Sequence, residues 1–301
     1  MRLFLWSLAS LVLLLGNVIG QHNGLNSTSA APSSSDPARD ALGFKTECLT
    51  PDVAPADAAR VEKEFQAIRK NSPSIQRAGL VLPLYYHILY RDLTFDGGYL
   101  SDAQVNSAVN MLNDGFSATG ISFRLDGIRR WHNATWFQQV DGTPENVDIE
   151  REMKQSTRIG GATTLNVWTS GMITAAGYAA FPWNYAANPI NDGVVMKWDV
   201  LPGNGNTVRS GKTITHEAGH WAGLLHTFQG GCTGDGDFVA DTPAQGTATD
   251  FNGCAPRDTC PSLPGEDPVF NFMNYSSDEC RNHFTWGQID KMWAAIAAWR
   301  L

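Results

Sequence analysis

Apolar positions between residues 80 and 200 change their spacing several times, and each spacing predicts a different element. Residues 80–90 (LVLPLYYHILY) form a nearly continuous apolar run, typical of a buried strand that begins near a sheet edge at Pro83. Ser101 and Gln104 form a capping box, which opens a helix with one apolar face. Further apolar runs predict four strands, at residues 121–125, 164–168, 177–183 and 194–198. A second helix is predicted at residues 147–156. About five strands and two helices indicate an α+β or α/β fold.

The segments that flank this region follow other patterns. Val61, Phe65 and Ile68 recur at helical spacing and predict a helix over residues 53–70. Residues 227–284 are rich in Gly, Asp and Pro, so we expect little regular structure there. A second capping box at Thr285 opens a final helix.

The N-terminus indicates the compartment. Met1 and Arg2 precede an apolar run over residues 3–15, and small residues follow up to Gly20. This order is typical of a secretory signal peptide over residues 1–20. A signal anchor is the alternative, although the run is short for a membrane span. We therefore expect a secreted, extracellular protein with no membrane partner.

Five cysteines and two glycosylation sequons fit an oxidising compartment. The sequons begin at Asn26 and Asn133. Four of the cysteines lie in the last quarter and are expected to form two disulfides, with three pairings open. Cys48 is left over and needs another explanation. The four clustered cysteines are Cys232, Cys254, Cys260 and Cys280.

The amino-acid composition limits the classes of partner that this chain can bind. The 301 residues carry a net charge of −8, so no overall basic surface exists to attract nucleic acid. A hydrophobic fraction of 43% and a charged fraction of 17% exclude a mostly disordered chain. Nothing suggests a coiled coil or another long interface, and we expect a monomer.

The chemistry is concentrated in residues 216–226 (HEAGHWAGLLH). His216 and His220 are four residues apart, which places both imidazoles on one helix face, about 40° apart in projection. Both can bind one zinc ion, and Glu217 beside them can act as the general base of metal-assisted hydrolysis. Gly223 can end the helix in a left-handed conformation and return His226 as a third ligand. Three protein ligands leave one position open, as in catalytic zinc sites.

Two other functions remain open at this point. One is a secreted binding protein with a structural metal site, although such a protein has little use for Glu217 beside an open position. The other is a zinc amidase that acts on non-peptide substrates. For the histidines themselves, the alternative is a helix with three satisfied side chains and no metal.

With Met273 in the later segment NFMNY, the motif resembles the metzincins, zinc endopeptidases that pair such a motif with a Met-turn. Residues 177–183 (GYAAFPW), 191–196 (NDGVVM) and 239–243 (VADTP) resemble the pappalysin branch, especially small secreted fungal members. The resemblance implies an α+β, metzincin-type domain over residues 79–301, with peptide or protein substrates. It would have a twisted, mostly parallel five-stranded sheet, two long helices above the cleft, and an irregular disulfide-stapled lower subdomain that ends in a helix.

The resemblance also implies roles for particular residues. Tyr275 matches a tyrosine that assists transition-state stabilisation, and the disulfide pairs would be Cys232–Cys260 and Cys254–Cys280. Cys48 matches a cysteine switch, whose thiolate blocks the zinc in a propeptide over residues 21–78. Here Leu49 stands where the family has Gly, and an unpaired thiol or an intermolecular disulfide is the alternative. Cleavage of the propeptide is expected between about residues 69 and 80.

Two acidic groups are assigned more weakly. Asp237, Asp241 and Thr242, with Asp235, offer oxygen ligands to calcium in a Gly-rich loop, and an ordinary acidic turn is the alternative. The resemblance places Asp278 and Glu279 near the pocket for the residue after the scissile bond, where they would favour Arg or Lys. The alternative is a solvated acidic pair.

Overall fold

The computed structural model describes residues 46–71, 79–204, 208–250 and 253–301. The predicted signal peptide, the sequon at Asn26 and most of the expected cleavage segment lie outside these residues. The helices and strands are β1 (Thr46–Cys48), α2 (Pro55–Asn71), β2 (Leu80–Tyr90), α3 (Asp102–Phe116), β3 (Ile121–His132), α4 (Ala134–Gln139), α5 (Val147–Thr157), β4 (Leu165–Ser170), β5 (Ala175–Ala179), β6 (Val194–Lys197), α6 (Thr213–Trp221) and α7 (Trp286–Trp299).

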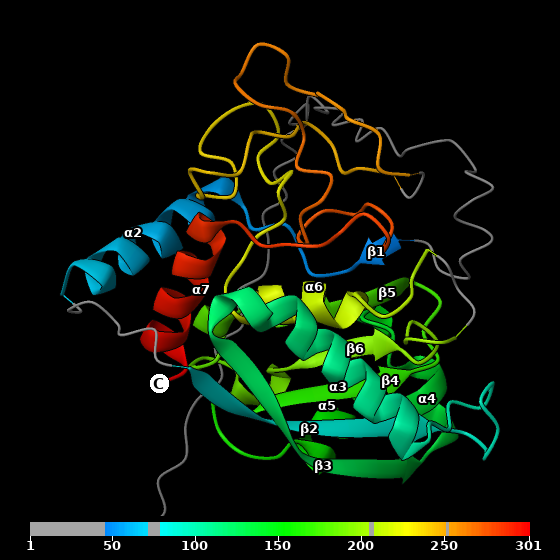
Figure 1. The fold of residues 1–301 in the computed structure, drawn as a ribbon. Coiled ribbons are helices and arrows are strands. Elements are labelled where there is room, and N and C mark those ends of the chain that lie inside the picture. The colour runs from blue at the N-terminus through cyan, green and yellow to red at the C-terminus, as the bar shows by residue number, and fades with distance from the viewer. Residues whose placement is uncertain (1–45, 72–78, 205–207, 251–252) are drawn as a thin grey trace, which may run out of the picture. The chain divides into compact units, whose positions relative to one another are not determined.

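Six strands form one sheet in the order β1-β5-β6-β4-β2-β3, and only the β5–β6 pair is antiparallel (Figure 1). The five strands expected from the sequence are all present. The sixth strand, β1, is a three-residue segment that the apolar pattern did not indicate. The strand expected at residues 177–183 is shifted to Ala175–Ala179, because Pro182 cannot donate to a ladder and begins a 3-10 turn.

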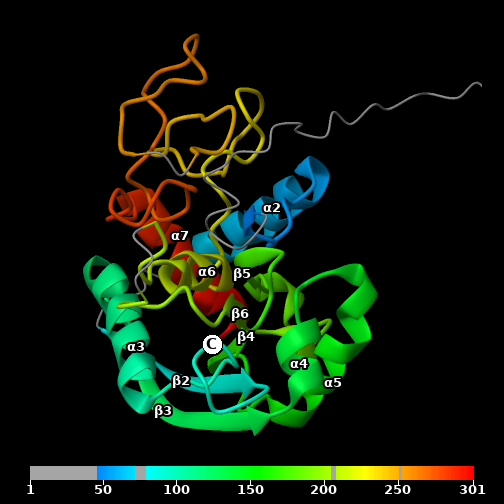
Figure 2. The ribbon, with the colours of Figure 1, turned by 90° about the vertical axis from the view of Figure 1, so that its right-hand side faces the viewer.

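The two faces of the sheet are covered by different helices. Val194 and Met196 point to the same apolar cluster as α3 and α6, whereas Val195 between them joins a second cluster with Phe137 of α4 and Met153 of α5. This alternation is the two-residue period of a strand buried on both faces. Figure 2 shows α3 on one side of the strands and α4 and α5 on the other.

The segment from Ala222 to Thr285 forms neither helix nor strand in its described residues, apart from one isolated bridge. Two disulfides hold it, Cys232–Cys260 and Cys254–Cys280, which is the pairing that the resemblance implied. Both predicted capping boxes are present, at Ser101 and Thr285. The sequon residue Asn133 caps α4, where its side chain accepts from the Trp136 amide.

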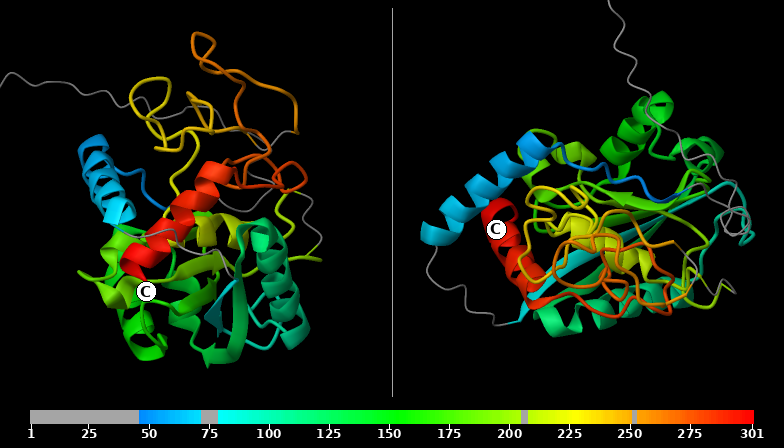
Figure 3. Two further views of the ribbon diagram at one scale, coloured as in Figure 1. Left: turned by 60° about the vertical axis from the view of Figure 1, so that its left-hand side comes forward. Right: turned by 90° about the horizontal axis from the view of Figure 1, so that it is seen from above.

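Helix α2 lies beside α7 (Figure 3). Lys291 of α7 connects them, because its ammonium lies 3.2 Å from the Glu62 carboxylate. The part of the chain that the structure describes contains no helix long and apolar enough to cross a membrane.

Candidate active site

Helix α6 presents the zinc motif in a dry environment. All nine of its residues are buried, His216, Glu217 and His220 among them. The helix ends at Trp221, and Gly223 has a φ of 104°. A Cβ at Gly223 would lie 2.6 Å from the Cβ of Ala295, so this turn needs glycine for both its backbone angle and its space. The reversal returns His226 to the other two histidines, as the spacing predicted.

Three imidazole nitrogens converge at this turn. Nε2 of His220 lies 3.2 Å from Nε2 of His216 and 3.1 Å from Nε2 of His226. Ligands held about 2.0–2.1 Å from one tetrahedral zinc are roughly 3.3 Å apart, so the spacing suits a shared ion.

The outer nitrogens of the histidines settle their protonation. Nδ1 of His216 donates to the Phe272 carbonyl at 2.7 Å, and Nδ1 of His220 donates to the Leu224 carbonyl at 2.8 Å. A carbonyl only accepts, so Nδ1 carries the proton and Nε2 presents its lone pair inward. Burial, with the neighbouring histidines as a second cause, lowers the pKa of both rings. Neutral rings with converging lone pairs are a donor set for a cation.

Glu217 lies beside this donor set and is itself fully buried. Burial raises its pKa to about 8. Its Oε2 accepts from the Thr50 hydroxyl at 3.2 Å and from the Cys48 thiol at 3.5 Å. Its Oε1 has no hydrogen-bond partner among the described residues. One carboxylate oxygen therefore remains available for a reacting proton.

The segment around β1 occupies the site. Cys48 Sγ and one nitrogen each of His216, His220 and His226 all lie within 4.8 Å of one another. Cys48 pairs with Gly177 because β1 runs parallel to β5. The sulfur therefore lies close enough to the three nitrogens to share one metal ion with them.

The structure accommodates Leu49 at the position where the family has Gly. Phe238 is the only non-glycine residue with positive φ in the described ranges, so Leu49 has an ordinary backbone conformation. Its amide donates to the Gly177 carbonyl at 3.0 Å, and its side chain packs against the cluster that contains Phe137. This backbone position does not require glycine.

Tyr275 and Met273 approach the histidines from the irregular segment. The Tyr275 hydroxyl lies 3.2 Å from Nε2 of His226 and 3.3 Å from the Cys48 carbonyl oxygen. Met273 is fully buried beneath α6, where a Cβ added to Gly219 would lie 2.5 Å from its sulfur. The methionine thus packs directly under the helix that carries the histidines.

The Gly219→Ala variant is expected to lose about 1–3 kcal/mol of stability, because the buried Met273 must move to admit a methyl group. The measurement is the thermal unfolding midpoint. Gly161→Ala is the matched control, since nothing lies within 4 Å of a Cβ there. Equal midpoints for the two variants would contradict this packing argument.

Comparison with known proteins decides the family. The family model described as pregnancy-associated plasma protein-A, a peptidase family, matches residues 146–297. An extracellular metalloprotease of Colletotrichum graminicola is 39% identical over 229 residues, 74% of this chain and 78% of the relative. Another, of Pyricularia oryzae, is 35% identical over 271 residues, 86% of this chain and 92% of the relative. The chain belongs to the pappalysin family of metallopeptidases.

Solved structures of similar fold support this assignment to the pappalysin family. A mutant of promirolysin from Tannerella forsythia has a TM-score of 0.69 at 25% identity and covers 84% of this chain and 94% of its own. Mature mirolysin in complex with a cleaved peptide has a TM-score of 0.62 at 25% identity, with 76% and 97% covered. The metzincin-type fold and the metallopeptidase activity expected from the sequence are thereby confirmed.

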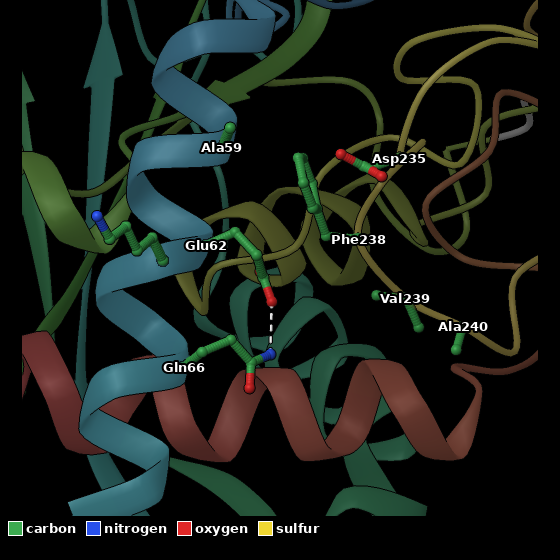
Figure 4. Close-up of a pocket in the computed structure, with 8 residues that line it drawn as sticks. Ala59, Glu62, Gln66, Asp235, Phe238, Val239 and Ala240 are labelled. Carbon is green, nitrogen blue, oxygen red and sulfur yellow. Dashed lines mark hydrogen bonds between the residues drawn. The ribbon is translucent and has the colours of Figure 1, made fainter.

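The calcium prediction for this pappalysin gains no support. Asp237 accepts from the Val239 amide and from the Thr242 hydroxyl, and Asp241 accepts from Thr285 and Gly287 at the start of α7. Their carboxylates therefore serve a turn and a helix N-terminus. The clusters of metal-ligating side chains in the described residues do not include them. Asp235 instead lines a cavity that faces α2 (Figure 4).

The two acidic residues that follow Met273, Asp278 and Glu279, differ in burial. Glu279 is exposed, as a solvated carboxylate would be, but Asp278 is only 1% exposed. Asp278 is paired with Arg281 and lies 3.6 Å from Arg209. Asp278 is therefore not a free anion for a basic substrate side chain, and the expectation is wrong for this residue. Glu47, Thr50 and Arg209 could not be found from local patterns, because their contacts join residues far apart in the chain. Arg281 was missed although it lies only three residues after Asp278.

Proposed function

We propose that this pappalysin is a secreted zinc endopeptidase made as a latent precursor. The observation that carries the proposal is the convergence of the Nε2 atoms of three histidines beside the buried side chain of Glu217. The names of the fungal relatives, extracellular metalloproteases, support secretion, as does the predicted signal peptide over residues 1–20.

The proposed chemistry assigns one role to each side chain. His216, His220 and His226 would hold zinc, a Lewis acid that lowers the pKa of a bound water molecule to about 7. Glu217 accepts the proton of the attacking water and delivers it to the leaving amine. The Tyr275 hydroxyl donates a hydrogen bond to the oxygen that becomes negatively charged. The dry surroundings of α6 strengthen both interactions.

The substrate would bind as an added strand along β5. Support comes from β1, which already forms a ladder with β5 through Thr46 and Cys48. An extended peptide can make the same main-chain bonds once β1 is gone. The solved complex of mirolysin with a cleaved peptide supports a peptide substrate.

Latency would depend on residues 21–78 as a propeptide, with 79–301 as the catalytic domain. Within the proposed propeptide, Cys48 would fill the open zinc position, and Thr50 donates to Glu217. The promirolysin mutant covers 84% of this chain whereas mature mirolysin covers 76%, which supports an N-terminal segment of this kind.

Casein digestion by the purified chain tests the enzyme proposal. We expect activity after limited proteolysis ahead of residue 80, loss of activity with a zinc chelator, and recovery when zinc is added. A chain that binds zinc but cleaves no protein would favour a binding protein with a structural metal. Cleavage of non-peptide amides alone would favour the amidase.

A further inference from the structure

Four charged side chains lie buried together next to the zinc-binding histidines. Glu47, Arg209, Asp278 and Arg281 all have side chains that are 0% exposed. Glu47 is paired with Nε of Arg209, and its Oε1 lies 3.1 Å from Nη1 of Arg281. One carboxylate of β1 therefore faces two guanidinium groups of the proposed catalytic domain. We call the site formed by Arg209, Asp278 and Arg281 the Glu47 site.

The charge of this site depends on Glu47. With Glu47 the four groups are neutral, and without it two arginines share one carboxylate. Asp278 cannot make up the difference, because it already accepts from the amides of Ser210 and Lys212 and is paired with Arg281. Removal of Glu47 would leave two guanidinium groups with one carboxylate, and this net positive charge favours a replacement carboxylate.

The donors of the site are also arranged for a carboxylate. The guanidinium group of Arg209 is oriented by the Tyr275 and Ser276 carbonyls, at 3.0 and 3.1 Å. Nε of the buried Arg281 has no hydrogen-bond partner among the described residues. Planar guanidinium donors match carboxylate oxygens in geometry and discriminate against neutral side chains.

The position of the site relates it to catalysis. Glu47 directly precedes Cys48, whose sulfur lies among the zinc-binding histidines, and both belong to the strand that pairs with β5. A substrate peptide that pairs with β5 would therefore place one of its side chains in the Glu47 site. That side chain would belong to a residue adjacent to the scissile bond, which lies beside Glu217.

We propose that the Glu47 site is a substrate subsite that binds an Asp or Glu side chain adjacent to the scissile bond, and that Glu47 occupies it in the precursor. This specificity rests on the proposed peptidase function. It is opposite in sign to the preference expected from Asp278 alone, because the two arginines outnumber that carboxylate.

Quenched peptides measure the preference on the matured wild-type protein, prepared from the full chain. In one set of peptides the residue before the scissile bond is Glu, Gln or Arg. In a second set the residue after the scissile bond is varied in the same way. We expect kcat/KM for Glu to exceed that for isosteric Gln by about tenfold or more, the usual gain of a charge-assisted hydrogen bond. Equal rates, or a preference for Arg, would overturn the subsite. A preparation that cleaves none of the peptides, and no casein, would refute the peptidase function itself.

Two variants of the full chain provide a second test. Glu47→Gln leaves the buried arginines one carboxylate short, so we expect the untrimmed protein to digest casein at least about tenfold faster than wild type. Glu62→Gln is the matched control, because it removes a carboxylate of α2 that pairs with Lys291, away from the histidines. We expect it to leave the activity unchanged. Equal activity of both variants would show that the site does not select a carboxylate.

Discussion

Replacing Glu217 by glutamine is expected to lower kcat/KM for peptide cleavage by about 10²–10⁴-fold, the range attributed to a general acid–base group. Glutamine has the same shape but accepts no proton at this position. The side chain is fully buried, and one of its oxygens has no hydrogen-bond partner in the described parts of the chain and is available for the proton. Casein and quenched peptides provide the rate measurement on matured protein.

The zinc content of the Glu217→Gln protein separates catalysis from metal binding. His216 and His220 keep their carbonyl partners at Phe272 and Leu224, which lie in the catalytic domain, so we expect one zinc per chain as in the wild type. Glu279→Gln is the control, because this exposed carboxylate lies in the same irregular segment and contacts neither Glu217 nor the histidines in the described contacts. Wild-type rates for Glu217→Gln would refute its role as the base.

Replacing Cys48 by alanine is expected to activate the untrimmed chain at least about tenfold on casein, which corresponds to a segment held ~1.4 kcal/mol more weakly. The sulfur lies within 4.8 Å of the three histidine nitrogens, and alanine leaves this position open. Activation is expected to be partial, because Thr50 still donates to Glu217 and Glu47 still faces the arginines.

Electrophoresis must show that the Cys48→Ala chain is still uncleaved when its activity is measured. Gln66→Ala serves as the control, because this exposed residue of α2 lies on the same segment but away from the histidines. A Cys48→Ala protein as latent as the wild type would show that steric cover by β1 blocks the site without the sulfur.

Several features of the fold and of the candidate site could be predicted from the spacing of nearby residues. The interval between His216 and His220, the capping boxes at Ser101 and Thr285, and the left-handed Gly223 are all properties of a few consecutive residues. Such features depend on helix geometry and backbone sterics, which act within one or two turns. The five longer strands were found from their apolar runs, which reflect burial on both faces in the middle of the sheet, whereas β3 at the edge is buried only near its start.

The sequence alone therefore predicted the three histidines that converge, the carboxylate of Glu217 beside them and the fold class. The resemblance implied that Cys48 covers the histidines, but only the tertiary structure showed that it lies on a strand beside β5, between Glu47 and Thr50. Strand β1 has three residues and no periodicity, and it pairs with β5 at a distance of more than 120 residues. Likewise, Asp278 looked like a free anion until Arg209 and Arg281 were found buried beside it. Arg281 is near Asp278 in sequence, but Glu47 and Arg209 are remote from it, so the net charge of the buried site could be counted only once the chain was folded.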